Sequence, residues 1–182
     1  REVEEIERRI RELLETNREI AERTTEEIKR LKKELEDSLE EIKKRLKELV
    51  DELRKLATDR RGDKTDLRRS VRRVEEEIRR LLDEHRKLSE EVMRTIEKLN
   101  EDSRRHTRET VEEIKELIKR LTIEEAVRRL EELVREIEDR SERLNKENED
   151  ELKKIEETSR KALKELEDRL REVKKEVREA ER

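Results

Sequence analysis

The stretch from Leu46 to Val74, LKELVDELRKLATDRRGDKTDLRRSVRRV, contains the clearest break in the sequence. Apolar residues recur at steps of three and four on both sides of residues 58–65, which is the spacing of one helical face. The break itself holds Gly62, the only glycine of the chain. A glycine can take the left-handed conformation that ends a helix, and Asp63 or Thr65 can cap the helix that follows. The stretch therefore predicts two helices joined by a short loop.

The same spacing continues outward in both directions, toward Val3 and toward Leu121. It slips between Leu121 and Ala126, where Thr122 and Glu125 fit a capping box that starts a third helix. Residues 121–123 contain neither Gly nor Pro, so a helix that continues through them is an open alternative, although the slip favours a turn. The prediction is a helix over about residues 1–57, a loop over 58–65, a helix over about 66–121, a tight turn near 122 and a helix over about 123–182.

Three helices of nearly equal length with short connections favour an up-down-up arrangement. We therefore predict an all-α protein, an elongated antiparallel three-helix bundle of long, straight, coiled-coil-like helices, forming one domain over residues 1–182. The apolar stripe of each helix is narrow, close to two positions in seven, and three such stripes can bury one another. A monomer is expected, and a partner chain is left open.

The composition excludes several classes of function. Charged residues make up 59% of the chain, and the net charge of −4 comes from 52 basic and 56 acidic residues that are finely interleaved. A nucleic-acid surface needs segregated basic residues, and single-strand binding uses aromatic rings, which this chain lacks. No apolar run approaches the roughly 18 residues that span a membrane, and no targeting signal is expected. We expect a soluble protein with no nucleic-acid, membrane or small-molecule substrate partner, and the compartment is left open.

Polar residues stand at positions where each helix should bury an apolar one. They are Asn17, Thr24, Ser38, His85, Asn100, Ser103, His106, Thr107, Thr110, Ser141, Asn145, Asn148 and Ser159. If the chain folds back at Gly62 and Thr122, these residues fall at shared levels on all three helices. Three such layers are predicted: Ser38 with His85 and Ser159, Thr24 with Asn100 and Asn145, and Asn17 with His106 and, about one turn away, Ser141. A hydrogen-bond network is the first interpretation of the polar middle, with a hydrated section or a polar ligand pocket as alternatives.

The chain has no Pro, Cys, Phe, Trp or Tyr, one Gly and one Met. Such a composition is typical of an idealised backbone filled with strong helix formers. Together with the polar layers, it resembles the family of de novo designed helical bundles with buried hydrogen-bond networks. The resemblance implies a structural scaffold with no natural biochemical activity, whose core polar residues make one helix register preferred over others.

The two histidines allow sharper hypotheses. They lie 21 positions apart on one predicted helix, roughly 30 Å along its axis, so they cannot share a metal, and no metal or cofactor site is predicted. Ser38 and Ser159 at the level of His85 would suggest a nucleophile and its base, but no oxyanion hole or orienting carboxylate is evident. The chain is therefore not expected to be an enzyme. The alternative function is a pH-responsive or partner-binding helical module, because protonation of a buried neutral imidazole would disrupt its layer.

The tripeptide Arg61-Gly62-Asp63 matches the integrin-recognition motif of adhesion proteins. Its structural interpretation is simpler, because a loop needs a glycine and Asp is a favoured cap after it. Three residues are a weak signal. An integrin-binding loop is the least favoured of the alternative functions.

Overall fold

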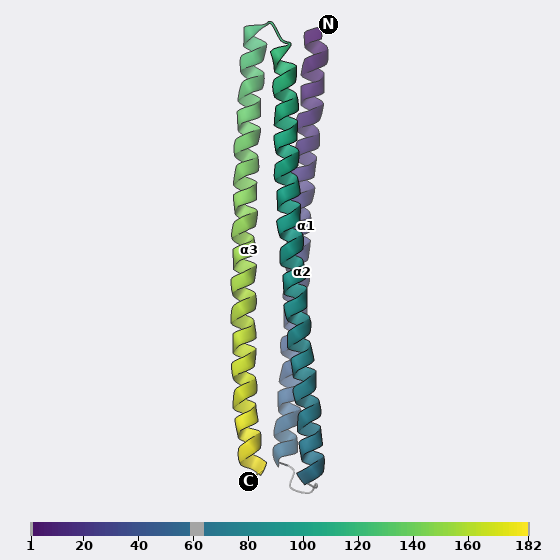
Figure 1. The fold of residues 1–182 in the computed structure, drawn as a ribbon, viewed down its shortest axis with the longest axis vertical. Helices are drawn as coiled ribbons and strands as arrows, with labels where there is room; N and C mark the ends of the chain where they lie inside the picture. Colours follow the sequence, from purple (N-terminus) through teal and green to yellow (C-terminus); the bar gives the residue numbers. More distant parts are fainter. Residues whose placement is uncertain (1, 59–63, 182) are drawn as a thin grey trace. The chain divides into compact units, whose positions relative to one another are not determined.

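The structure is a computed structural model that describes residues 2–58 and 64–181, apart from the side chains of residues 57, 64, 177, 180 and 181. It consists of three α-helices, α1 (Glu2–Thr58), α2 (Lys64–Lys119) and α3 (Glu124–Glu181), and the described residues include no strand. Figure 1 shows α2 returning along α1 and α3 returning along α2. The predicted all-α, up-down-up three-helix bundle is confirmed.

The ends of the helices carry the charges that suit the helix dipole. Glu2, Glu4 and Glu5 lie in the first turn of α1, and Lys119 lies in the last turn of α2. Carboxylates near the partly positive helix start and ammonium groups near the partly negative helix end each stabilise a helix by a few tenths of a kcal/mol to about 1 kcal/mol. These charges support helices whose interiors already consist of good helix formers.

The connection between α2 and α3 is a turn and not a continued helix. The amides of Arg120 and Leu121 donate to the carbonyls three residues before them, at 3.1 and 2.9 Å, which tightens the end of α2. The carbonyl of Ile123 accepts the amide of Val127 at 3.1 Å, so Ile123 occupies the cap position of α3. The N-cap of α3 is therefore Ile123 and not Thr122, which the capping-box pattern predicted. Thr122 lies one residue before it.

The connection between α1 and α2 is where the sequence analysis placed Gly62 and the Arg61-Gly62-Asp63 motif. These three residues lie outside the described part of the chain. Helix α2 begins at Lys64, so Thr65, the alternative cap, is the second residue of the helix.

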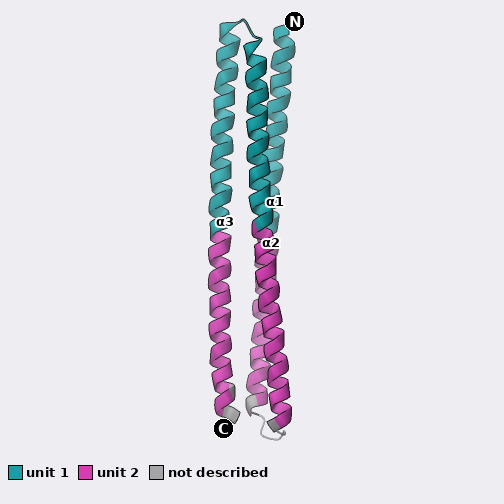
Figure 2. Cartoon of the chain, in the orientation of Figure 1, with its two compact units in different colours: residues 1–31, 94–153 teal, residues 32–93, 154–182 magenta. Residues whose placement is uncertain are grey.

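Two compact units, each built from all three helices, divide the chain (Figure 2). Unit 1 comprises residues 1–31 and 94–153, and unit 2 comprises residues 32–93 and 154–182. Each unit contains its own hydrophobic core. That residues 1–182 behave as one domain remains a prediction.

Ion pairs between the helices show how the segments run within the units. In unit 1, Arg9 of α1 pairs with Glu113 of α2 at 3.3 Å. In unit 2, Arg45 of α1 pairs with Glu77 of α2 at 2.9 Å. Residue numbers thus fall on α2 as they rise on α1, which is an antiparallel pairing. The pairs are at least partly exposed, and such pairs contribute at most about 1 kcal/mol each.

The cores of the two units consist of branched aliphatic side chains. Ile10 and Ile114 are fully buried in the core of unit 1, whereas Ile78, Leu46 and Val173 are buried in the core of unit 2. Burial of one such side chain stabilises the fold by about 1.5–3 kcal/mol. The apolar stripes that predicted the helices therefore supply most of the stabilising contacts.

Little apolar surface remains outside these cores. The large hydrophobic side chains that are exposed among the described residues are Ile123 and Leu133, at 50% and 38% of their full exposure. In the described part of the chain, no helix has a stretch apolar enough to cross a membrane.

We predict that Ile114→Ala lowers the free energy of unfolding by about 2–5 kcal/mol, because it removes a fully buried side chain and leaves a cavity. The matched variant Ile123→Ala, at a half-exposed position, should cost less than about 1 kcal/mol. Guanidinium unfolding followed by circular dichroism at 222 nm measures both. Equal costs for the two variants would contradict the assignment of the unit 1 core.

Candidate functional site

Most of the buried polar side chains lie in unit 1, between the apolar contacts of its three helices. Those in unit 1 are Asn17, Thr24, Asn100, Ser103, Thr107, Thr110, Asn145 and Asn148, and those in unit 2 are His85, Ser89 and Ser159. Each stands on the inner face of its helix because it replaces an apolar residue in the three-and-four spacing. A polar group in such a place costs free energy unless it is hydrogen-bonded.

Two of these buried residues, Asn17 on α1 and Thr107 on α2, form one connected set with the half-buried His106 on α2 and Ser141 on α3, which we call the Asn17 cluster. The Thr107 hydroxyl donates to Asn17 Oδ1 at 3.1 Å, and the Ser141 hydroxyl donates to Thr107 Oγ1 at 3.1 Å. His106 Nδ1 lies 3.2 Å from the same Asn17 oxygen. One cluster therefore joins all three helices of unit 1.

The acceptor at the centre of the cluster fixes the roles of its neighbours. An amide oxygen only accepts hydrogen bonds, so His106 Nδ1 must carry the hydrogen of its contact with Asn17 Oδ1. The Thr107 hydroxyl then gives its single hydrogen to Asn17 and uses a lone pair to accept from Ser141. The donor direction thus runs from α3 to α2 and from α2 to α1.

Burial makes these contacts energetically important. Asn17 and Thr107 are buried, whereas His106 and Ser141 are half-buried. A made hydrogen bond of this type contributes about 0.5–1.5 kcal/mol, whereas a buried group that loses its partner costs about 1–3 kcal/mol. The cluster is therefore much more favourable when the three helices keep this alignment than when they slip.

The other predicted layer of unit 1 is not joined in the same way. Asn100 Oδ1 is buried and has no hydrogen-bond partner, so this oxygen does not link Asn100 to Thr24 or Asn145. One turn further along α2, Arg104 binds Glu149 of α3 through Nη2, and its buried Nε has no partner. The buried residues Thr24, Asn100 and Asn145 thus all face inward, but the oxygen of Asn100 does not connect them.

His85 in unit 2 is fully buried, and neither of its ring nitrogens has a hydrogen-bond partner. The predicted contacts with Ser38 and Ser159 are not made: Ser38 is half-buried, and Ser159 instead lies 3.3 Å from the Ser89 hydroxyl. Burial lowers the pKa of His85 below its ordinary value of 6.5, because the charged imidazolium would lose its hydration. The ring is therefore neutral at pH 7.

These arrangements offer little of the chemistry that a catalytic or metal site requires. No hydroxyl is hydrogen-bonded to the His85 ring, so the nucleophile–base pair considered above is not formed there. The His106 ring contacts an amide oxygen and not an orienting carboxylate. Among residues 2–58 and 64–181, no group of three or more His, Cys, Asp or Glu side chains could hold a metal ion.

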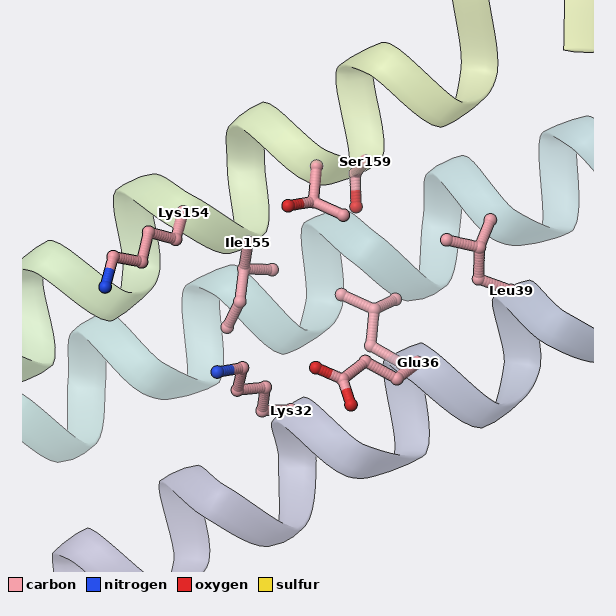
Figure 3. Close-up of a pocket in the computed structure, with 8 residues that line it drawn as sticks. Lys32, Glu36, Leu39, Lys154, Ile155 and Ser159 are labelled. Carbon is pink, nitrogen blue, oxygen red and sulfur yellow. The ribbon is translucent and has the colours of Figure 1, made fainter. Parts of the chain in front are cut away.

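Two larger surface grooves lie beside the polar residues, and a small one of about 30 Å³ borders Asn17 and Ser141. One, of about 260 Å³ in unit 2, is lined by Leu39 and Glu36 of α1 and by Ile155 and Ser159 of α3, and Figure 3 shows the Lys32 and Lys154 side chains at one end of it. The other, of about 390 Å³ in unit 1, lies between α2 and α3 beside Thr107 and Ser141 and is lined only by polar and charged residues. Ligand pockets usually exceed about 300 Å³ and are mostly apolar with a few placed polar groups. Neither groove combines both properties.

Ser89 and Arg104 are two inward-facing polar residues that the sequence analysis missed. The apolar spacing had assigned Leu88, and not its neighbour Ser89, to the inner face of the helix. Ser89 nevertheless lies four residues after His85 and three before Val92, on the same helical face. That spacing is a usable signal. Arg104 is half-buried because its long side chain reaches Glu149, which no pattern within α2 alone could indicate.

Comparison with known proteins supports the fold. A solved structure titled "Computationally designed three helix bundle" aligns with 99% of this chain and 87% of its own, with a TM-score of 0.56 and 17% sequence identity. At this identity the likeness concerns the fold alone. No protein-family model matches the sequence, and no curated protein matches it.

We predict that Thr107→Val lowers the free energy of unfolding by about 1–3 kcal/mol, because it removes the donor to Asn17 and the acceptor of Ser141 at nearly constant volume. The matched control is Thr158→Val at an exposed position of α3, which should change stability by no more than about 0.5 kcal/mol. Chemical unfolding of both variants tests this. A Thr107→Val protein as stable as the control would show that the contacts contribute nothing.

Proposed function

We propose that this chain is a designed structural scaffold with no natural biochemical activity, and that the Asn17 cluster sets the alignment of its three helices. The observation that carries the proposal is the set of three contacts at one amide and one hydroxyl that link α1, α2 and α3. A functional site in the chemical sense would face a cleft or a ligand. The two most buried members of this cluster, Asn17 and Thr107, are hydrogen-bonded to each other across two helices, and the groove beside Thr107 is lined only by polar and charged residues.

Apolar contacts alone do not determine how the three helices are aligned along their axes. Leu, Ile and Val recur so regularly that helices displaced by one heptad would still bury apolar side chains against one another. The polar contacts do not tolerate such a displacement, because it would leave Asn17 Oδ1 and the Thr107 hydroxyl buried and unpaired. Buried polar residues that fix register in this way are the best-attested structural use of such groups.

The proposal of a designed origin has two supports. The composition lacks nearly all the residues that interrupt helices, and the fold is similar to that of a computationally designed bundle. A scaffold of this kind is proposed to be a monomer, because the exposed large apolar side chains described are only Ile123 and Leu133. An apolar groove that would bind a partner helix needs a broader exposed stripe.

We predict that replacing the whole cluster by apolar residues leaves stability unchanged or raised but reduces structural uniqueness. The variant is Asn17→Leu, His106→Leu, Thr107→Val and Ser141→Ala combined. It leaves none of the four polar side chains behind, so little desolvation cost remains. Its unit 1 amide resonances should broaden or double in a heteronuclear NMR spectrum, because alternative registers become comparable in free energy.

The control is Ser89→Ala with Ser159→Ala, which removes the polar contact of unit 2 and should leave the unit 1 resonances sharp. Light scattering should give the single-chain mass of 22.5 kDa for the parent and both variants. A fourfold variant that keeps one sharp set of resonances would contradict the alignment role.

A further inference from the structure

The two histidines lie in opposite chemical settings on the same helix, one in each unit. His85 in unit 2 is fully buried, and neither ring nitrogen has a partner. Buried residues precede and follow it on its helical face, namely Leu82, Ser89 and Val92. A proton added to this ring would create a charge that no hydrogen-bond acceptor receives.

His106 in unit 1 differs in both respects. It is half-buried, and its Nδ1 already donates to Asn17 Oδ1. Protonation adds a hydrogen at Nε2 and leaves the Nδ1–H donor in place, so the contact with Asn17 survives. The Asn17 cluster therefore tolerates the charged ring.

No charged group compensates for a proton on His85. The interhelical contacts Arg45–Glu77 and Ser89–Ser159 define which residues of α1 and α3 share its level. The titratable and charged side chains near this level are Glu36, Asp37, Glu40, Glu41 and Lys43 on α1, Asp83, Glu84, Arg86 and Lys87 on α2, and Glu156, Glu157, Arg160, Lys161, Lys164, Glu165, Glu167 and Asp168 on α3. All of them are exposed except Glu167, which is half-buried and bound by Arg86. Burial is the one cause that shifts the pKa of His85.

We propose that mild acid opens unit 2 selectively, through protonation of His85, while unit 1 keeps its packing. This inference goes beyond the alignment role proposed above, since it assigns a response to one unit and to one residue. Its test also does not depend on the Asn17 cluster having that role.

The direction of the effect follows from linkage. The folded pKa of His85 lies below the value of 6.5 expected in the open chain. The free energy of opening unit 2 therefore has its full value above pH 6.5. It falls as the pH decreases from 6.5 toward the folded pKa of His85, because the open state binds the proton more tightly. The opening constant rises by at most about tenfold for each pH unit in this window.

Carboxylates act in a separate window. Hydrogen bonding to Arg30 lowers the pKa of Glu27 from its ordinary value of 4.5. The contribution of such a group is complete above pH 4.5 and is lost as the pH falls below it. Measurements between pH 7.5 and 5.0 therefore stay above the window in which Glu27 contributes.

The experiment is amide hydrogen exchange of the full chain between pH 7.5 and 5.0, corrected for the intrinsic exchange rate and resolved by peptide. Within α2, residues 66–93 report on unit 2 and residues 94–118 on unit 1. Protection in the unit 2 segment should fall by up to about tenfold per pH unit below pH 6.5. Protection in the unit 1 segment should change by less than about twofold.

Two variants assign the effect. His85→Leu should keep unit 2 protection constant over the whole range, and His106→Gln should respond to acid as the parent does. NMR titration of the parent's two imidazoles supplies a readout that needs no variant, because His85 should protonate below pH 6.5 and together with the loss of unit 2 protection. Constant unit 2 protection in the parent, equal loss in both units, or an acid response that survives in His85→Leu would overturn the proposal.

Discussion

One buried amide oxygen, Asn17 Oδ1, accepts the hydrogen bonds that connect α1 to α2 in unit 1. Asn17 Oδ1 receives a hydroxyl and an imidazole hydrogen from α2, and the same hydroxyl is tied to α3. Water cannot readily replace these contacts at a buried position, so a displacement of any one helix leaves unpaired polar groups behind. Apolar burial provides most of the stability, and the proposed role of this small polar set is to make one of several apolar alignments lowest in free energy.

The two units differ in how completely their inner polar groups are paired. Unit 1 combines the Asn17 cluster with two unpaired buried atoms, Asn100 Oδ1 and Arg104 Nε. Unit 2 has the Ser89–Ser159 contact and a fully buried imidazole with no partner. A neutral unpaired imidazole is tolerable, but a charged one is not. The same residue type is therefore hydrogen-bonded in one unit and buried without a partner in the other.

The sequence predicted the helices well because their determinants are local. The apolar spacing, Gly62 and the slip after Leu121 are all visible along the chain, and the described helix ends lie within a few residues of the predicted ones. Comparing levels predicted a layer of Asn17, His106 and Ser141, and in the structure His106 contacts Asn17 while Ser141 contacts Thr107. It could not show which atoms bond, because a level fixes height along a helix but not the direction of a side chain. His85 and Asn100 illustrate this, since both are buried although both ring nitrogens of His85 and Oδ1 of Asn100 have no hydrogen-bond partner.

The tautomer of His106 tests the central claim most directly. Long-range correlation of the ring nitrogens with the ring protons at pH 8 reads it in the intact chain, where only two histidines contribute signals. The account predicts that neutral His106 carries its hydrogen on Nδ1, since Asn17 Oδ1 can only accept. A neutral ring with its hydrogen on Nε2 would contradict it, because His106 Nδ1 would then donate nothing to Asn17 Oδ1.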